Sequence, residues 1–99
     1  MIPEKIKNMI PPLRATAFDK DPIVYAKLFH PLSKCQWYIT EYDQMEDLCF
    51  GLVAAFENEI GYFSLQELRE INVGGLPIEI DRFWKPTPLS IVKAAIKNR

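Results

Sequence analysis

The sequence holds few of the side chains that usually carry catalysis or metal binding. It contains one histidine, His30, and two cysteines, Cys35 and Cys49. A zinc site takes three or four ligands from histidine, cysteine and carboxylates, and this chain has no C-x-x-C or H-x-x-x-H pair. The G-x-S-x-G, P-loop and G-x-G-x-x-G motifs are absent as well. We therefore expect no catalytic residue, no metal and no cofactor.

The two cysteines are expected to stay reduced. Short connections between strand-like segments predict an antiparallel hairpin with Glu41 opposite Leu48. That register places Cys35 near Ala54, too far from Cys49 for a disulfide. Free thiols, together with an N-terminus that does not resemble a secretory signal, predict a cytoplasmic protein.

Carboxylates are the functional groups that do cluster. They fall into two stretches that we expect to be turns of a sheet: Glu41, Asp43, Glu46 and Asp47, and then Glu57 and Glu59. Neighbouring carboxylates can share a proton or bind a divalent cation, but the D-x-[DN]-x-[DN]-G spacing of a calcium loop is absent. We interpret these residues as an acidic surface that docks a basic protein partner, such as a nuclease or another DNA-processing protein.

The net charge of −1 conceals a segregation of charge along the chain. Residues 1–34 hold six Lys/Arg against three Asp/Glu, residues 35–81 hold one against ten, and residues 82–99 hold five against none. The basic ends could fold over the acidic middle and neutralise it, which is the simpler interpretation. Alternatively, the acidic middle is a surface that meets a basic partner.

A second hypothesis is that the protein binds single-stranded nucleic acid. Trp37 and Tyr38 would stack on bases from one strand of the sheet. Phosphates would be held by basic side chains from both ends of the chain: Arg14, Lys85, Lys93 and Lys97. However, aromatic residues at strand spacing usually belong to the core, and acidic residues flank this strand. Nucleic acid is therefore the less favoured partner.

The length of 99 residues and the 48% of hydrophobic residues suit a single domain. No apolar run reaches the ~18–20 residues of a membrane span, so we expect no membrane interaction. The pattern predicts the α+β class, with a small antiparallel four-stranded sheet and two or three short helices packed on it. Strands are expected near 23–29, 36–42, 48–56 and 78–81, in the order they occur along the chain. Helices are expected near 3–9, 65–72 and 88–97.

Local signals mark the ends of these elements. Ser64 and Glu67 form a capping box that begins the second helix, and Gly74-Gly75 is expected to end it. Thr87 is expected to cap the last helix, because a proline follows it. Gly51, inside an apolar strand, predicts a bulge or a close backbone contact.

Apolar residues that recur at strand or helix spacing are expected to belong to the core. They are Val24, Leu28, Trp37, Ile39, Phe50, Leu52, Leu65, Leu68, Val92 and Ile96. A core of this size is modest, as a domain of this length allows.

Six short sequence words occur in a fixed order: K-L-F-x-P (27–31), W-Y-I-T-E-Y-D (37–43), F-G-L (50–52), E-I-G-Y-F-S-L-x-E-L (59–68), G-L-P-I-E-I-D (75–81) and P-L-S (88–90). Over roughly residues 12–92 the chain resembles the bacterial family named domain of unknown function 2958. That family occurs on plasmids, phages and other mobile elements, and it has no assigned catalytic residues. The resemblance implies an accessory or counter-defence factor, such as an antirestriction or anti-CRISPR protein, that acts by binding another protein.

Overall fold

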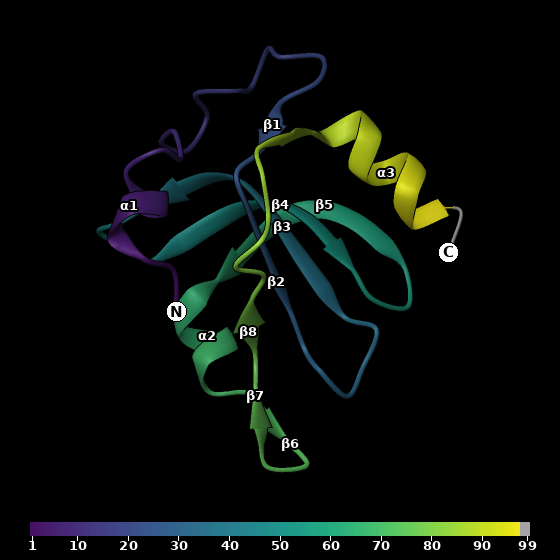
Figure 1. Ribbon diagram of the computed structural model, residues 1–99. Coiled ribbons are helices and arrows are strands. Elements are labelled where there is room, and N and C mark those ends of the chain that lie inside the picture. The colour runs from purple at the N-terminus through teal and green to yellow at the C-terminus, as the bar shows by residue number, and fades with distance from the viewer. Residues whose placement is uncertain (98–99) are drawn as a thin grey trace.

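A five-stranded antiparallel sheet forms the centre of the protein, whose structure is a computed structural model that describes residues 1–97 (Figure 1). The strands lie in the order β5-β4-β3-β2-β8. Their bounds are Asn58–Ser64 for β5, Leu48–Ala54 for β4, Gln36–Asp43 for β3, Ala26–Phe29 for β2 and Glu79–Ile80 for β8. The expected α+β class and antiparallel sheet are confirmed, and β5 is a strand beyond the four expected.

A β-bulge bends strand β3 against β4. The pairing shifts by one residue between Ile39 and Glu41, which leaves Thr40 as an extra residue in β3. Gly51 is required opposite this point, because a Cβ atom there would lie 1.8 Å from the Tyr38 carbonyl oxygen. The close contact expected at Gly51 is therefore confirmed. The bulge also turns Glu41 onto the face of the sheet opposite to that of Ile39.

Helices cover both faces of the sheet. Helices α1 (Glu4–Lys7) and α2 (Leu65–Arg69) lie against one face, and α3 (Leu89–Lys97) lies against the other (Figure 1). We call these the α1/α2 face and the α3 face. None of the described helices has the length and apolar character that crossing a membrane would need.

Each face has its own apolar cluster. The cluster on the α1/α2 face includes Leu28, Ile39, Cys49, Leu65 and Leu68. The cluster on the α3 face includes Tyr38, Leu52, Ala54, Val92 and Ile96. Because both faces are covered, the side chains of β3 are buried from Trp37 through Tyr42, whichever face of the sheet they point to. This burial explains why consecutive large side chains, Trp37, Tyr38 and Ile39, do not alternate with polar ones in the first half of the strand.

The expected helices are present but shorter than predicted at several ends. The predicted capping box is confirmed in part, since the Ser64 Oγ accepts a hydrogen bond from the Glu67 backbone N–H at 3.3 Å. The helix that begins there, α2, ends at Arg69. Gly74 and Gly75 therefore do not end it, contrary to the prediction.

The two glycines instead form the turn of a small hairpin. Strand β6 (Asn72–Val73) pairs with β7 (Leu76–Pro77). Gly74 and Gly75 lie between them with φ angles of 62° and 80°. A two-residue type I′ turn needs positive φ at both positions, and glycine adopts it without strain.

The N-terminus of α3 is held by a residue from the other end of the chain. The Asp21 carboxylate accepts hydrogen bonds from the Ser90 backbone N–H at 2.8 Å and from the Ser90 Oγ at 2.6 Å. Thr87 is not the cap, because it belongs with Pro88 to β9, which pairs with β1 (Ile23–Val24). An acidic group at this helix end also interacts favourably with the helix dipole.

Two further expectations are wrong. The expected strand near 78–81 does not lie beside the expected strand near 48–56. It is β8, which pairs with β2, and the second neighbour of β4 is β5. Strand β5, which alternates polar or small residues with apolar ones, was not among the expected strands. The predicted core is buried except at Phe50, which is half-buried because it packs edge-on against the exposed Tyr62 ring.

The contact at Gly51 leads to a prediction with a built-in control. Replacing Gly51 with alanine forces a methyl group into the Tyr38 backbone and should lower the free energy of unfolding by about 1–3 kcal/mol or more. Gly61 lies opposite Gly51 on β5, and a Cβ atom there meets nothing within 4 Å. Gly61→Ala should therefore leave stability nearly unchanged. Urea unfolding of both variants checks this, and an equal loss in the two would contradict it.

Candidate docking site

The structure does not gather the predicted acidic residues into one surface. Asp43, Glu46 and Asp47 lie at the β3–β4 turn, whereas Glu57 and Glu59 lie at the β4–β5 turn. Strand β4, with seven residues, separates the two turns by about 20 Å. Of the predicted set, Glu57 and Glu59 lie at the start of β5, whose outer side no strand among residues 1–97 pairs with.

Glu41 is buried and is not part of any acidic surface, which corrects the prediction. Its side chain is 3% exposed and faces the segment before β1. One carboxylate oxygen accepts the Arg14 backbone N–H at 2.7 Å, and the other accepts the Thr16 backbone N–H at 2.9 Å together with the Thr16 hydroxyl. The carboxylate thus anchors a loop, and Arg14 is held there in a left-handed conformation with a φ of 73°.

Asp47 is engaged in contacts within the protein. Its carboxylate pairs with the Arg69 guanidinium and accepts a hydrogen bond from the Tyr42 hydroxyl at 2.6 Å. The hydrogen bonds from Arg69 and Tyr42 keep the pKa of Asp47 below its usual value. Burial, followed by the hydrogen bond to Asp47, raises the pKa of Tyr42. Of the first acidic turn, Glu46 is exposed and Asp43 is half-buried.

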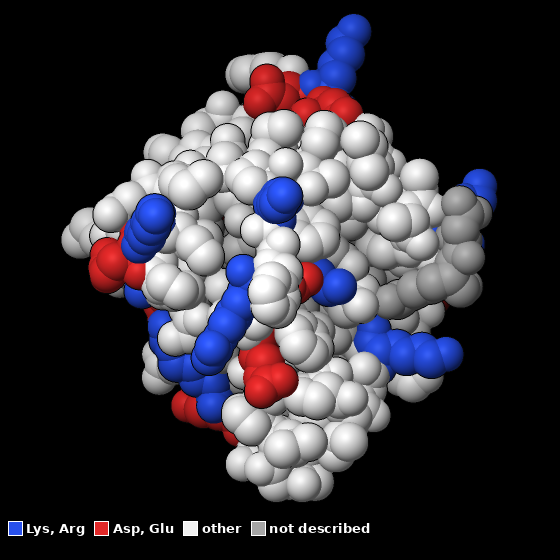
Figure 2. All heavy atoms as spheres, viewed as in Figure 1, with Lys and Arg blue, Asp and Glu red and all other residues white. Residues whose placement is uncertain are grey.

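Among residues 1–97, no ion pair joins a basic end of the chain to the acidic middle. In the part of the chain that the structure describes, the one ion pair joins Arg69 to Asp47, and both residues belong to the middle. Figure 2 shows basic side chains spread over the visible face and interleaved with acidic ones. The segregation of charge in the sequence therefore does not produce a patch of single sign on this face.

The aromatic residues proposed to stack on bases are not available. Trp37 is 9% exposed and Tyr38 is 4% exposed. Tyr38 packs against Trp84 with ring centroids 5.6 Å apart, and the Lys27 amine lies over both rings. This correction removes the stacking platform. The basic candidates are exposed: Arg14, Lys85, Lys93 and Lys97.

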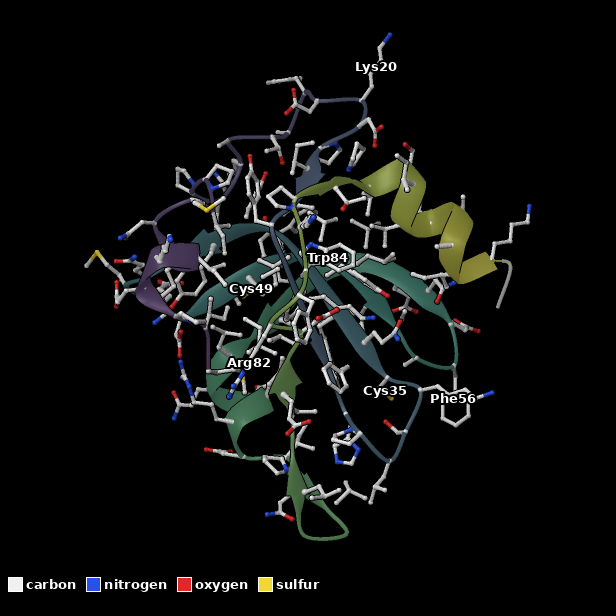
Figure 3. The ribbon with its side chains drawn as sticks, in the orientation of Figure 1. Lys20, Cys35, Cys49, Phe56, Arg82 and Trp84 are labelled. Atoms are coloured by element: carbon white, nitrogen blue, oxygen red, sulfur yellow. The ribbon has the colours of Figure 1, made fainter. Side chains whose placement is uncertain are left out.

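Strand β5 is the open edge of the sheet. It pairs with β4 on one side over its whole length, and no strand pairs with it on the other side among residues 1–97. Ile60 is 46% exposed and Tyr62 is 55% exposed, and both lie on the α3 face. Phe56, in the turn before β5, is fully exposed and points away from the fold (Figure 3).

The hydrogen bonds between β4 and β5 determine which backbone groups face outward. The bonds at the ends of this pairing run from the Leu65 N–H to the Asp47 carbonyl oxygen (3.0 Å) and from the Ala55 N–H to the Glu57 carbonyl oxygen (3.3 Å). Bonded and non-bonded residue pairs alternate along an antiparallel ladder. Counting inward from both ends, Ile60 and Tyr62 direct their N–H and C=O groups to the open edge, and Glu59 and Gly61 direct theirs to β4.

A cavity of about 390 Å³ adjoins this edge on the α3 face. Its walls come from the segment 14–22, the first residue of α3, and the side chains of Ile60 and Tyr62. Thr40, Glu41 and Phe50 form its floor. A second cavity of about 340 Å³ lies along the same strand, between Ile60 and the last turns of α3. The two share Ile60, so hollows flank this residue on both sides.

The remaining reactive side chains are those of the histidine and the two cysteines. His30 is buried, and its Nδ1 accepts the Leu32 N–H at 3.1 Å while its Nε2 lies 3.0 Å from the Leu76 carbonyl oxygen. Cys35 and Cys49 are both free, and burial raises the pKa of the Cys49 thiol to about 12. Within residues 1–97, no group of three histidine, cysteine or carboxylate side chains is placed to hold a metal ion.

The residues that sequence reasoning missed are Ile60 and Tyr62. The alternation of Glu59, Ile60, Gly61 and Tyr62 is itself a strand pattern, with an apolar side chain at every second position. That signal was present in the sequence. What it did not reveal is that the strand lies at an edge, because edge position depends on which strands pair.

A comparison with models of known protein families identifies the family of this α+β chain. The model of the family described as "Protein of unknown function (DUF2958)" matches residues 1–98, and the chain belongs to that family. The resemblance noted in the sequence is thereby confirmed. Neither the curated proteins nor the solved structures yielded a significant match.

The anchoring role of Glu41 can be tested by substitution. Glu41→Ala leaves the N–H groups of Arg14 and Thr16 without their partner, which should lower the free energy of unfolding by about 1–3 kcal/mol. Hydrogen exchange at these two amides should also become faster. Glu46→Ala, at the exposed turn, is the control and should change stability by less than about 0.5 kcal/mol. Unchanged exchange in Glu41→Ala would contradict the anchoring role.

The Asp47–Arg69 pair predicts a dependence of stability on acid pH. The lowered pKa of Asp47 contributes stability that is fully present above the unfolded pKa of about 3.9 and is lost as pH falls through the folded value. Asp47→Asn should therefore lose less stability than the wild type between pH 6 and pH 3. Urea unfolding at both pH values measures this, with Glu46→Gln as a control that should lose as much stability as the wild type. An equally large loss of stability in Asp47→Asn would refute the prediction.

Proposed function

We propose that this protein is a non-enzymatic docking module that binds an extended segment of another protein as an additional strand on β5. One observation carries this proposal: a seven-residue edge strand directs free backbone groups outward beside the exposed side chains of Ile60 and Tyr62. Strand addition to an open edge is a common mode of recognition, in which main-chain hydrogen bonds supply affinity and alternate side chains supply specificity.

The opposite edge of the sheet is much less suited to strand addition. Strand β8 has only two residues, so it offers few backbone groups in a row. Short edge strands are one of the ways in which proteins avoid unwanted pairing. Strand β5 lacks such protection, because it is regular throughout and contains neither lysine nor proline.

The charges near β5 support a partner with basic side chains. Glu57 and Glu59 are exposed at the start of the strand, and they are the part of the predicted acidic set that lies beside this edge. Exposed charges at the rim of an interface mainly raise the association rate. The surface of a nuclease or another DNA-processing protein would meet this requirement.

The family resemblance gives this proposal a biological setting. A small docking protein carried by a plasmid, phage or other mobile element would act by occupying a surface on a host or phage protein. An antirestriction or anti-CRISPR role, exerted in the cytoplasm, is the form of the proposal that this setting favours. Binding without catalysis is sufficient for such a role.

Proline substitution at β5 tests strand addition directly. Ile60→Pro removes an N–H that faces outward, so it should abolish binding of peptides selected on the wild type from a random heptapeptide library while leaving the fold intact. Glu59→Pro removes an N–H directed to β4 and should destabilise the protein. Ile60→Ala keeps the outward N–H and should retain measurable binding.

Amide exchange provides a second readout for the same experiment. In wild-type protein saturated with a selected peptide, the Ile60 and Tyr62 amides should become protected, with little change at Glu59 and Gly61. Peptides that bind without protecting these two amides, or that bind Ile60→Pro as tightly as the wild type, would show that strand addition is wrong.

A further inference from the structure

The cavity beside Tyr62 has the chemistry of a pocket for one large apolar side chain. Its volume is about 390 Å³, which is enough for an aromatic ring. The Phe50 and Tyr62 rings meet edge to face on one side, with centroids 4.9 Å apart. Ile60, Ala17 and Leu89 complete an apolar lining. Aromatic pairs of this kind offer ring edges and faces to a third ring.

Glu41 does not turn this cavity into a cation site. Its carboxylate lies at the floor, but its two oxygens already accept hydrogen bonds from Arg14 and Thr16. The exposed charged side chains of the lining are the basic Arg14 and Lys20 and the acidic Asp19. A basic side chain entering the cavity would therefore meet an occupied acceptor in Glu41 and more like charges than opposite ones. An apolar side chain meets neither difficulty.

The opposite face of β5 has different chemistry. Glu59 and Gly61 project to the α1/α2 face, because they alternate with Ile60 and Tyr62. Glu59 is exposed, and the space above Gly61 is open, since a Cβ atom built there meets no atom within 4 Å. A long basic side chain could lie across Gly61 and reach the carboxylate of Glu59.

We infer, on the basis of the strand addition proposed above, that the docked strand alternates apolar and basic residues and inserts one aromatic side chain into the cavity beside Tyr62. The alternation follows from geometry, because neighbouring residues of an added strand fall on opposite faces of the sheet. Apolar residues then meet Ile60 and Tyr62, and basic residues meet Glu59. The partner is thus a protein with an exposed amphipathic strand of this pattern.

Synthetic heptapeptides test the inference. The probe alternates lysine with valine and carries phenylalanine at its centre. We expect it to bind wild-type protein about tenfold more tightly than the same peptide with alanine at the centre, because the ring fills the cavity. The peptide in which glutamate replaces every lysine should bind at least about tenfold more weakly than the probe.

A variant that fills the cavity separates this effect from general hydrophobicity. Ala17 lies in the exposed segment that lines the cavity, so Ala17→Trp should occupy the space without disturbing the core. In this variant the phenylalanine and alanine peptides should bind equally. Ala17→Ser, the control, should keep the difference. Equal affinities of the two peptides for wild-type protein would overturn the inference about the cavity.

The outcomes also distinguish this inference from the proposed function. If all of the heptapeptides bind with equal affinity and protect the Ile60 and Tyr62 amides, strand addition stands and the side-chain pattern is wrong. If N-methylation of the probe backbone leaves its affinity unchanged, strand addition itself is wrong. If the protein forms a dimer that protects the same amides without peptide, a second copy occupies the edge, and both proposals fail.

Discussion

A close backbone contact is the constraint on which the rest of the structure depends. Gly51 passes so near to the Tyr38 carbonyl that no side chain fits between the strands. The bulge at this point brings Glu41 to the α3 face, where its carboxylate binds the backbone of residues 14–16. The anchored segment in turn forms the wall that faces Ile60 across the cavity. The absence of a side chain at Gly51 is thus linked, through the bulge and Glu41, to the surface next to the open strand.

The stability of the sheet and the openness of its edge have separate origins. Helices cover both faces, and two apolar clusters fill the space between helix and sheet. Strand β5 contributes little to either cluster, since it has no fully buried side chain. The free energy of folding therefore does not require that the edge be closed. A strand of this kind can exchange solvent for a partner without any rearrangement of the core.

The sequence predicts the parts of the fold that depend on local pattern. The strands β2, β3 and β4, the cap at Ser64 and the close contact at Gly51 are all recognisable, because each signal lies within a few residues. Glu41 was misassigned because a carboxylate on a strand looks the same whether solvent or a distant loop receives it. Its partners are 25 and 27 residues away in the sequence. The edge position of β5 was not predicted for a similar reason. It depends on the pairing of β8 with β2, which leaves no further strand among the described residues to pair with β5.

The contact between Asp21 and Ser90 has a consequence for how the chain is made. These residues are 69 positions apart, so α3 receives its cap only after all of the strands between them have been synthesised. Until α3 docks, the face of the sheet that carries Tyr38 and Leu52 has no cover. Once the strands have paired, this apolar face therefore stays uncovered until the residues of α3 have been added.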